Sequence, residues 1–209
     1  LCANFLTLSQ NRQRIRKKKY PKKFDKNHSD LIIKKLPFKL TNSQKNVFDE
    51  INADLVSNNR MFRIIQGDVG SGKTIVSLLS IFNVVKSGYQ CALMSPTEIL
   101  SKQHYELSKK IFNNENLTIN FLTGKTEYKD KKKIMDNLKN GKTQLLIGTH
   151  ALFQKKISFK KLGLIVIDEQ HKFGVNQRKR LSDKGGNNCD VLLRTATPIP
   201  RIVTMTMYG

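Results

Sequence analysis

From residue 36 onward, short apolar runs alternate with longer amphipathic stretches. The apolar runs predict six strands, over residues 62–66, 90–95, 117–122, 143–149, 162–168 and 189–197. The amphipathic stretches predict helices over residues 74–88, 98–112 and 127–139. Strands that alternate with helices favour a mostly parallel sheet with helices on both faces. The almost uninterrupted apolar run over 164–167 fits a strand buried on both sides, so the predicted fold class is α/β.

Residues 1–35 differ in character and are predicted to form a basic helical linker segment. The stretch from Arg12 to Lys35 holds eleven Lys and Arg against two Asp. Pro21 is expected to end or interrupt any helix that begins before it. A solvated helix followed by a linker is the preferred interpretation, and a basic arm that touches phosphates is the alternative. The segment has too few apolar residues to fold without neighbours.

A phosphate-binding loop is the strongest motif in the chain. Residues 67–74 read GDVGSGKT, which matches G-x-x-x-x-G-K-[ST] between a predicted strand and a predicted helix. The glycines let successive backbone N–H groups face one point, at a helix N-terminus where the dipole favours an anion. Lys73 is expected to reach the β- and γ-phosphates, and the Thr74 hydroxyl to bind Mg²⁺. The loop residues predicted to bind ATP are Gly67, Asp68, Val69, Gly70, Ser71, Gly72, Lys73 and Thr74.

An acidic pair follows the last buried run before residue 170. The strand over 162–168 delivers Asp168 and Glu169 to its carboxyl end, the edge where ligands bind in open α/β sheets. Asp168 is expected to hold Mg²⁺ directly or through water, and Glu169 to orient and deprotonate the attacking water. With Lys73, these two are the predicted catalytic residues. His171 is either a functional partner of this site or a helix-start histidine satisfied by local hydrogen bonds.

Charge and composition narrow the possible partners. The 209 residues carry 38 Lys and Arg against 16 Asp and Glu, a formal net charge of +22. This excess favours polyanions such as nucleic acid or nucleotides, although a lysine-rich coding background would produce it too.

No apolar run approaches the roughly 18 residues of a membrane-spanning helix. The three widely spaced cysteines fit a reducing compartment, and the start, which lacks Met and a signal-peptide pattern, suggests a piece of a longer protein.

Further motifs carry a family resemblance. In chain order they are LPFKLTNSQ (36–44), QGDVGSGKT (66–74), MSPTEIL (94–100), LTGK (122–125), GTHALFQ (148–154), DEQHKFGV (168–175) and TATPIPR (195–201). Together they resemble superfamily 2 helicases and, more narrowly, the RecG family of bacterial ATP-dependent DNA helicases, which remodel stalled forks. Transcription-repair coupling factors share several of these motifs but typically carry DEEQ where this chain has DEQH.

The resemblance implies a RecA-like P-loop domain over residues 36–209, the first motor domain of a DNA helicase acting in recombination and repair. ATP and Mg²⁺ are the implied cofactors, DNA is the implied partner, and a cytoplasmic, nucleoid-associated location is implied. A second RecA-like domain with an arginine finger, and a wedge domain, are expected outside these residues, so the fragment alone is expected to hydrolyse little ATP. A non-motor P-loop enzyme and a nucleic-acid-binding module with a dead nucleotide site remain open.

The resemblance also assigns roles by position. Gln44 is similar to the glutamine that reads adenine, and the alternative is a solvated residue at a helix start. The positions that match DNA-backbone motifs are Pro96, Thr97, Thr123, Gly124 and Thr149. The positions that match the coupling of hydrolysis to movement are His171, Thr195 and Thr197. Arg194 departs from the family pattern, which leads us to expect an apolar or small residue there.

Overall fold

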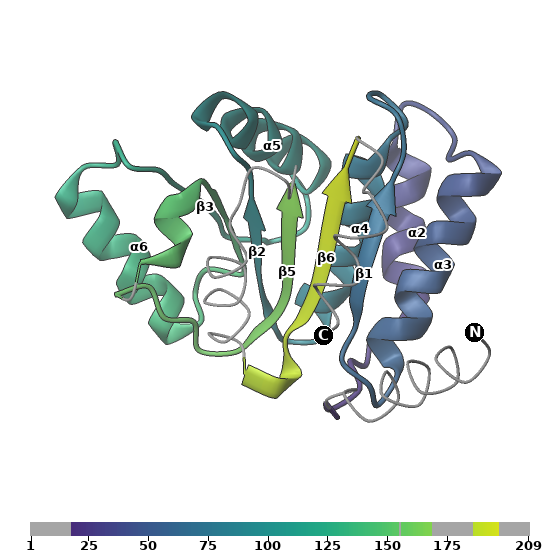
Figure 1. Ribbon diagram of the computed structural model, residues 1–209, viewed down its shortest axis with the longest axis horizontal. Helices are drawn as coiled ribbons and strands as arrows, with labels where there is room; N and C mark the ends of the chain where they lie inside the picture. The colour runs from purple at the N-terminus through teal and green to yellow at the C-terminus, as the bar shows by residue number, and fades with distance from the viewer. Residues whose placement is uncertain (1–17, 155, 169–185, 197–209) are drawn as a thin grey trace, which may run out of the picture.

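The computed structural model describes residues 18–154, 156–168 and 186–196. In these ranges six strands form one sheet in the order β1-β6-β5-β2-β4-β3 (Figure 1), and every neighbouring pair is parallel. The strands are β1 (Phe62–Gln66), β2 (Gln90–Met94), β3 (Ile119–Leu122), β4 (Leu145–Gly148), β5 (Leu162–Asp168) and β6 (Asp190–Thr195). The predicted α/β class is confirmed, and each predicted strand is present with only small shifts at its ends.

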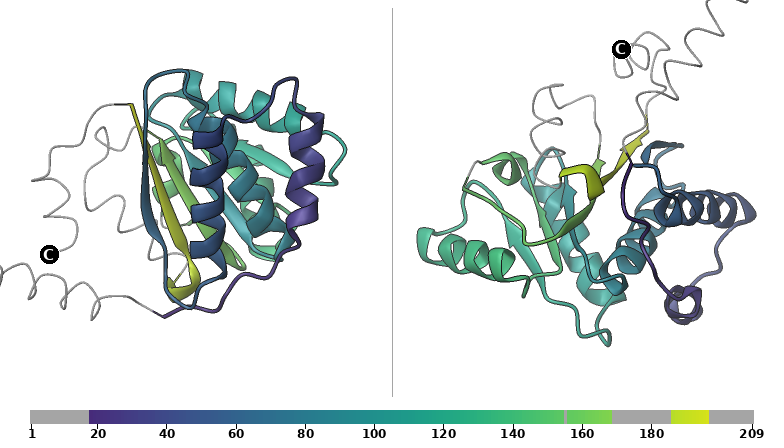
Figure 2. Two further views of the ribbon diagram at one scale, coloured as in Figure 1. Left: turned by 90° about the vertical axis from the view of Figure 1, so that its right-hand side faces the viewer. Right: turned by 90° about the horizontal axis from the view of Figure 1, so that it is seen from below.

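Helices cover both faces of the sheet, as predicted. They are α2 (Lys26–Lys35), α3 (Asn42–Val56), α4 (Lys73–Lys86), α5 (Glu98–Ile111) and α6 (Tyr128–Asn140), with short 3₁₀ turns η1 (His150–Phe153) and η3 (Gly186–Asn188). Helices α4 and α5 pack on one face, α2 and α3 pack against α4, and α6 covers the opposite face (Figure 2). None of the helices in the described ranges has the length and apolar character needed to cross a bilayer.

The side chains of the central strands divide the core into two parts. In β5, Leu164 and Val166 join the cluster under α4 and α5, whereas Ile165 and Ile167 join the cluster under α6. All four are buried. Because successive residues of a strand point to opposite faces, a strand covered on both faces needs apolar side chains at consecutive positions. This requirement accounts for the apolar run that the sequence shows there.

Helix α3 adds an element to those predicted. It begins with a capping box: the Thr41 hydroxyl accepts from the Gln44 N–H at 3.2 Å, and Gln44 Oε1 accepts from the Thr41 N–H at 2.9 Å. Phe48, Ile51 and Leu55 form its buried side. The T-x-x-Q pattern and the three- and four-residue apolar spacing are the local signals for this helix.

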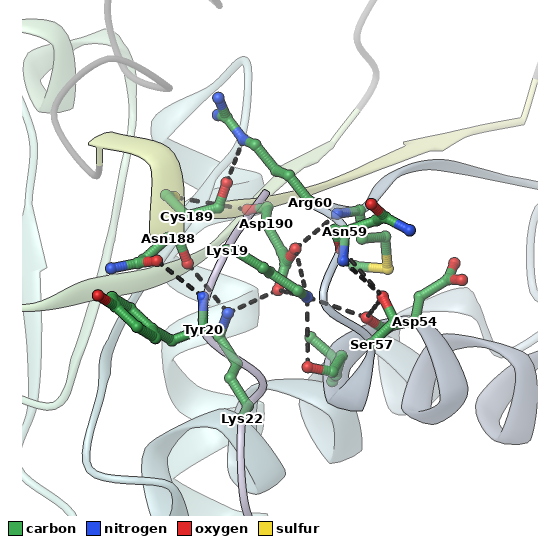
Figure 3. Close-up of polar contacts among 12 residues, drawn as sticks. Lys19, Tyr20, Lys22, Asp54, Ser57, Asn59, Arg60, Asn188, Cys189 and Asp190 are labelled. Atoms are coloured by element: carbon green, nitrogen blue, oxygen red, sulfur yellow. Dashed lines mark hydrogen bonds and ion pairs between the residues drawn. The ribbon is translucent and has the colours of Figure 1, made fainter. Parts of the chain in front are cut away.

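A strap of residues 18–22 runs between the end of α3 and the start of β6 (Figure 3). The Lys19 N–H donates to the Asn58 carbonyl at 2.8 Å, and the Lys22 N–H donates to the Leu55 carbonyl at 3.1 Å. On the other side, the Tyr20 N–H donates to Asn188 Oδ1 at 3.0 Å. The strap therefore joins two segments that lie far apart in the sequence.

Two lysines of the strap are buried against one carboxylate. Asp190 Oδ2 lies 2.7 Å from Lys19 Nζ and 2.6 Å from Lys22 Nζ, and all three side chains are fully buried. The Met61 N–H donates to Asp190 Oδ1 at 2.6 Å. Burial lowers the pKa of Lys19 from its ordinary value, although the charge of Asp190 opposes this change. The predicted solvated basic segment is therefore wrong for these two lysines.

Candidate functional site

The carboxyl ends of the six strands lie along one edge of the sheet, and the predicted site residues follow these ends. Strands β1, β6 and β5, which are neighbours, lead to the phosphate loop, Thr195 and Asp168. Strands β2, β4 and β3, also neighbours, lead to Pro96, Thr149 and Thr123, which were predicted for the DNA backbone. The strand order therefore places the residues predicted for the nucleotide on one half of this edge and the residues predicted for DNA on the other half. In the sequence, by contrast, the residues predicted for DNA lie between those predicted for the nucleotide.

The phosphate loop connects β1 to α4. Gly70 and Gly72 have φ values of 83° and 82°, in the left-handed region that favours glycine. Gly72 is the N-cap of α4, so the free N–H groups of the first helical turn open toward the loop. Lys73 Nζ donates to the carbonyl oxygens of Gly67 and Asp68, at 2.5 Å and 2.6 Å. The ammonium group therefore stays with the loop, in reach of an anion bound there.

The remaining loop residues differ in exposure. Asp68, Val69 and Ser71 are exposed, and Thr74 is half-buried in the first turn of α4. The loop offers backbone N–H donors, the hydroxyls of Ser71 and Thr74 and one ammonium, against the single carboxylate of Asp68. These donors are suited to bind a phosphate chain from solvent.

Two contacts tie the loop to other predicted site residues. The Gly67 N–H donates to the Thr195 carbonyl at 3.3 Å, which links the loop to the end of β6. Gln44 Nε2 donates to the Ser71 carbonyl at 2.9 Å. Gln44 is half-buried and uses its amide on the capping box and the loop, and its predicted contact with adenine stays a prediction.

Asp168 lies at the end of β5 in contact with two basic side chains. Its Oδ2 is 2.8 Å from His104 Nε2 and 2.7 Å from Arg194 Nη2. Burial alone would raise the pKa of Asp168, but the hydrogen bond from His104 and the charge of Arg194 outweigh it, so the pKa lies below its usual value. Asp168 is therefore ionised at neutral pH and can bind a cation. Arg194, which departs from the family pattern, has a charged partner here.

The sequence did not single out His104 as a site residue. Ser101, His104 and Ser108 are the buried residues of α5, and their three- and four-residue spacing places them on one side of the helix. That spacing is the signal by which a histidine directed at the sheet could have been found. Its contact with Asp168 depends on the order of strands, which no local pattern reveals.

The residues predicted to contact DNA occupy loop starts with different degrees of exposure. Thr97 is exposed and caps α5 by accepting from the Leu100 N–H at 3.2 Å, and Pro96 is half-buried. Gly124 is exposed, whereas the buried Thr123 hydroxyl accepts from the Lys125 N–H at 3.3 Å. Thr149 is also buried. Contacts of these residues with DNA stay predictions.

Three predicted residues lie outside the described ranges. They are Glu169, His171 and Thr197. Their predicted roles as water-orienting base and coupling residues rest on the sequence alone.

The donor set at the nucleotide end of the edge fits a hard divalent cation. Thr74 and Asp168 offer hydroxyl and carboxylate oxygens, which Mg²⁺ prefers, and Mg²⁺ in such sites is held by few protein oxygens together with phosphate and water. In the described ranges, no group of three or more His, Cys, Asp and Glu could enclose a metal by itself. Burial raises the pKa of Cys189 to about 12 and that of Cys91 above its ordinary value, so neither thiol is a ready ligand.

Solved structures place the fold among helicases. The structure of RecG bound to a three-way DNA junction superposes with a TM-score of 0.81 at 42% identity, covering 99% of this chain and 27% of that chain. The DEAD-box helicase Mss116 bound to single-stranded RNA superposes with a TM-score of 0.67 at 21% identity, covering 88% of this chain and 41% of that one. The second likeness shows the fold alone, which is the predicted RecA-like one.

Sequence relatives narrow the family. The ATP-dependent DNA helicase RecG of Thermotoga maritima is 46% identical over 202 residues, covering 94% of this chain and 26% of the relative. That of Bacillus subtilis is 48% identical over 178 residues, covering 85% of this chain and 26% of the relative. The chain thus spans about a quarter of the length of these relatives. The family model described as DEAD/DEAH box helicase matches residues 41–206. This chain therefore belongs to the DEAD/DEAH box helicase family, as one whose relatives include the RecG helicases.

Proposed function

We propose that this chain is the ATP-binding motor domain of a RecG-type DNA helicase that acts on branched DNA in recombination and repair. The observation that carries the proposal is the division of one sheet edge into a nucleotide half and a second half with the motifs predicted for DNA. The RecG helicases among its relatives and the RecG structure on a three-way junction support it. They do not favour a transcription-repair coupling factor or a non-motor P-loop enzyme.

The nucleotide half is suited to hold a triphosphate. Backbone N–H groups of the loop and of the first turn of α4 bind phosphate oxygens, and Lys73 adds the charge that neutralises them. Thr74 and Asp168 would hold Mg²⁺, which neutralises phosphate charge when bound. Glu169 is the proposed base for the attacking water. Gln44 is the proposed adenine contact.

Coupling to movement is proposed to pass through the end of β6. The Thr195 carbonyl accepts from the Gly67 N–H, so a change in the phosphate loop acts directly on the strand that leads to Thr197. His171 is the proposed partner of this segment. Hydrolysis at full rate is assigned to the whole protein, because the family pattern places the arginine finger in a second motor domain.

The DNA half is proposed to contact the backbone without reading sequence. Hydroxyls and N–H groups at Thr97, Gly124 and their neighbours suit phosphate oxygens, which position a protein on DNA but carry no base information. The net charge of +22 supports association with a polyanion.

Nucleotide binding tests the proposal directly. A fluorescent ATP analogue titrated with this chain in Mg²⁺ is expected to bind saturably and to be displaced by unlabelled ATP. Lys73→Ala is expected to weaken that binding roughly ten- to hundredfold, since a charge-assisted contact contributes about 1.5–3 kcal/mol. Lys86→Ala removes a charge at the far end of the same helix and serves as the matched control. Equal affinities for the wild type and Lys73→Ala would refute the nucleotide site.

DNA binding tests the second half of the proposal. The affinity for duplex and three-way-junction DNA is expected to fall steeply with salt, with log K decreasing by about 0.9 per phosphate neutralised for each unit of log salt. Two DNA molecules of equal length and shape but different sequence are expected to bind equally well. Fluorescence anisotropy between roughly 50 and 300 mM salt, the range over which such contacts weaken, measures both effects. A salt-independent affinity, or a strong preference for one sequence, would contradict backbone contacts.

A further inference from the structure

Three side chains from three elements meet at the middle of the sheet edge. Asp168 of β5, Arg194 of β6 and His104 of α5 form a closed triangle: besides the two contacts to Asp168 Oδ2, Arg194 Nη2 lies 3.0 Å from His104 Nε2. Arg194 is buried to 1% exposure and His104 to 8%. A charged group this deeply buried needs a partner, and the carboxylate of Asp168 provides it.

The sheet itself determines this meeting. Asp168 and Arg194 are register partners on adjacent parallel strands, so their side chains leave the sheet on the same face. Leu164 and Val166 in β5 and Leu192 in β6 alternate in phase with them and lie under α4 and α5. His104 reaches that face from α5. The residue at position 194 is therefore directed at the carboxylate whatever its chemistry.

Both basic groups use the same oxygen of the carboxylate. A carboxylate only accepts and a guanidinium only donates, so the hydrogen bond at 2.8 Å requires a proton on His104 Nε2. With that proton in place, the approach of Arg194 to the imidazole is a contact without a hydrogen bond. His104 therefore fixes the direction of the carboxylate, and Arg194 cancels its negative charge.

The triangle lies where the two halves of the edge adjoin. His104 belongs to the helix that Thr97 caps, on the side of β2. Arg194 precedes Thr195, whose carbonyl binds the phosphate loop. Since β5 and β2 are neighbours in the sheet, Asp168 is the point at which a side chain from the proposed DNA half touches the proposed nucleotide half.

We propose that His104 and Arg194 are positioning residues of Asp168 with opposite effects on a divalent cation: His104 orients the carboxylate for it, and Arg194 competes with it. This inference rests on the proposed function, because it concerns the cation that accompanies the nucleotide. In a chain with an apolar residue at position 194, no neighbouring guanidinium would offset the negative charge of this carboxylate. The arginine therefore holds down the affinity for the metal until its contact with Asp168 is released.

Linkage between nucleotide and metal measures both effects. The ratio of the nucleotide Kd in EDTA to the Kd in saturating Mg²⁺ reports how strongly the site favours the metal. Arg194→Met is expected to raise this ratio about tenfold, because an opposite charge in direct contact shifts a carboxylate's preference for a cation by at least that order. The affinity of Arg194→Met for the nucleotide in EDTA is expected to be unchanged or lower than that of the wild type. The probe is a fluorescent ATP analogue, with Mn²⁺ electron paramagnetic resonance as a second readout of metal affinity.

His104 variants are expected to move the ratio in the other direction. His104→Leu removes the group that orients the carboxylate, and the ratio should fall about tenfold, which is the low end for one lost hydrogen bond to a charged group. His104→Gln places an amide N–H close to the position of Nε2 and should restore most of the ratio. If His104 had a purely structural role, both variants would change the thermal unfolding temperature, but the ratio of the two Kd values would be the same for His104→Leu and His104→Gln.

The controls separate failure of this inference from failure of the proposed function. Lys86→Met removes one positive charge from the opposite end of α4 and should leave the ratio unchanged. Arg194→Gln, which keeps a polar group without charge, replaces Arg194→Met if the latter does not fold. If the wild type binds the nucleotide but neutral residues at position 194 leave the ratio unchanged, the inference is overturned and the function stands. If the wild type binds no nucleotide, both fall.

Discussion

Asp190→Ala is expected to lower the free energy of unfolding by about 3–5 kcal/mol, the range for removing one partner of a buried ion pair. The reason is the environment of the two lysines that this carboxylate holds. The side chains of Lys19 and Lys22 have 0% exposure, so without Asp190 two ammonium groups stay buried with no opposite charge. Either the two ammonium groups stay buried at that cost, or the strap detaches from the rest of the domain.

Urea denaturation followed by circular dichroism measures this effect, and a surface ion pair provides the comparison. Asp54 accepts from Arg63 Nε at 2.8 Å, but the two side chains are 37% and 30% exposed. Asp54→Ala is therefore expected to cost less than about 1 kcal/mol, since solvent screens such pairs. A result in which both variants lose similar stability would mean that Asp190 does not hold the strap.

The consequence for function is that the strap and β6 act as one body. Asp190 begins the strand that ends at Arg194 and Thr195, beside Asp168 and the phosphate loop. A variant that releases the strap is therefore expected to disturb nucleotide binding as well as stability. Conversely, bound nucleotide is expected to slow the proteolytic cleavage of the strap, which digestion with and without nucleotide would measure.

Local patterns were enough to predict the strands, and to place residues 67–74 and Asp168 after β1 and at the end of β5. Apolar runs bounded by turn residues predicted every strand in the described ranges, because burial on both faces leaves little choice of residue. The glycines of residues 67–74 predicted a turn with backbone angles that few other residues adopt, and the φ values of Gly70 and Gly72 confirm that turn. Phosphate binding by the turn stays a prediction. Such features depend on neighbours along the chain.

Contacts between distant residues could not be predicted in this way. The pairing of Lys22 with Asp190 spans 168 positions, and nothing near either residue indicates the other. The basic segment looked solvated because lysine is rarely fully buried, and only a buried carboxylate reverses that expectation. Arg194 looked like a misfit for the same reason: its partner Asp168 becomes its neighbour only through the order of β5 and β6. Strand order and the residues it brings together were therefore the part that required the structure.

Gly72→Ala is expected to reduce nucleotide affinity beyond detection, and Gly88→Ala is expected to leave it unchanged. The two glycines flank opposite ends of α4 with nearly the same φ, at 82° and 78°. Alanine at either position meets a similar strain of about 1–2 kcal/mol from the left-handed conformation. Gly88→Ala therefore controls for the backbone strain alone, and any further loss in Gly72→Ala comes from the surroundings of Gly72.

The two glycines differ in what surrounds them. A Cβ at Gly88 has nothing within 4 Å, whereas a Cβ at Gly72 would overlap Nε2 of Gln44. Gln44 would have to leave the Ser71 carbonyl, and the loop would lose that support just where its N–H groups must converge on phosphate. Titration of a fluorescent ATP analogue, with unfolding measured on the same samples, tests both expectations. If Gly72→Ala and Gly88→Ala bind nucleotide equally well, the geometry of this loop does not determine binding, and the assignment of residues 67–74 as the phosphate site would have to be abandoned.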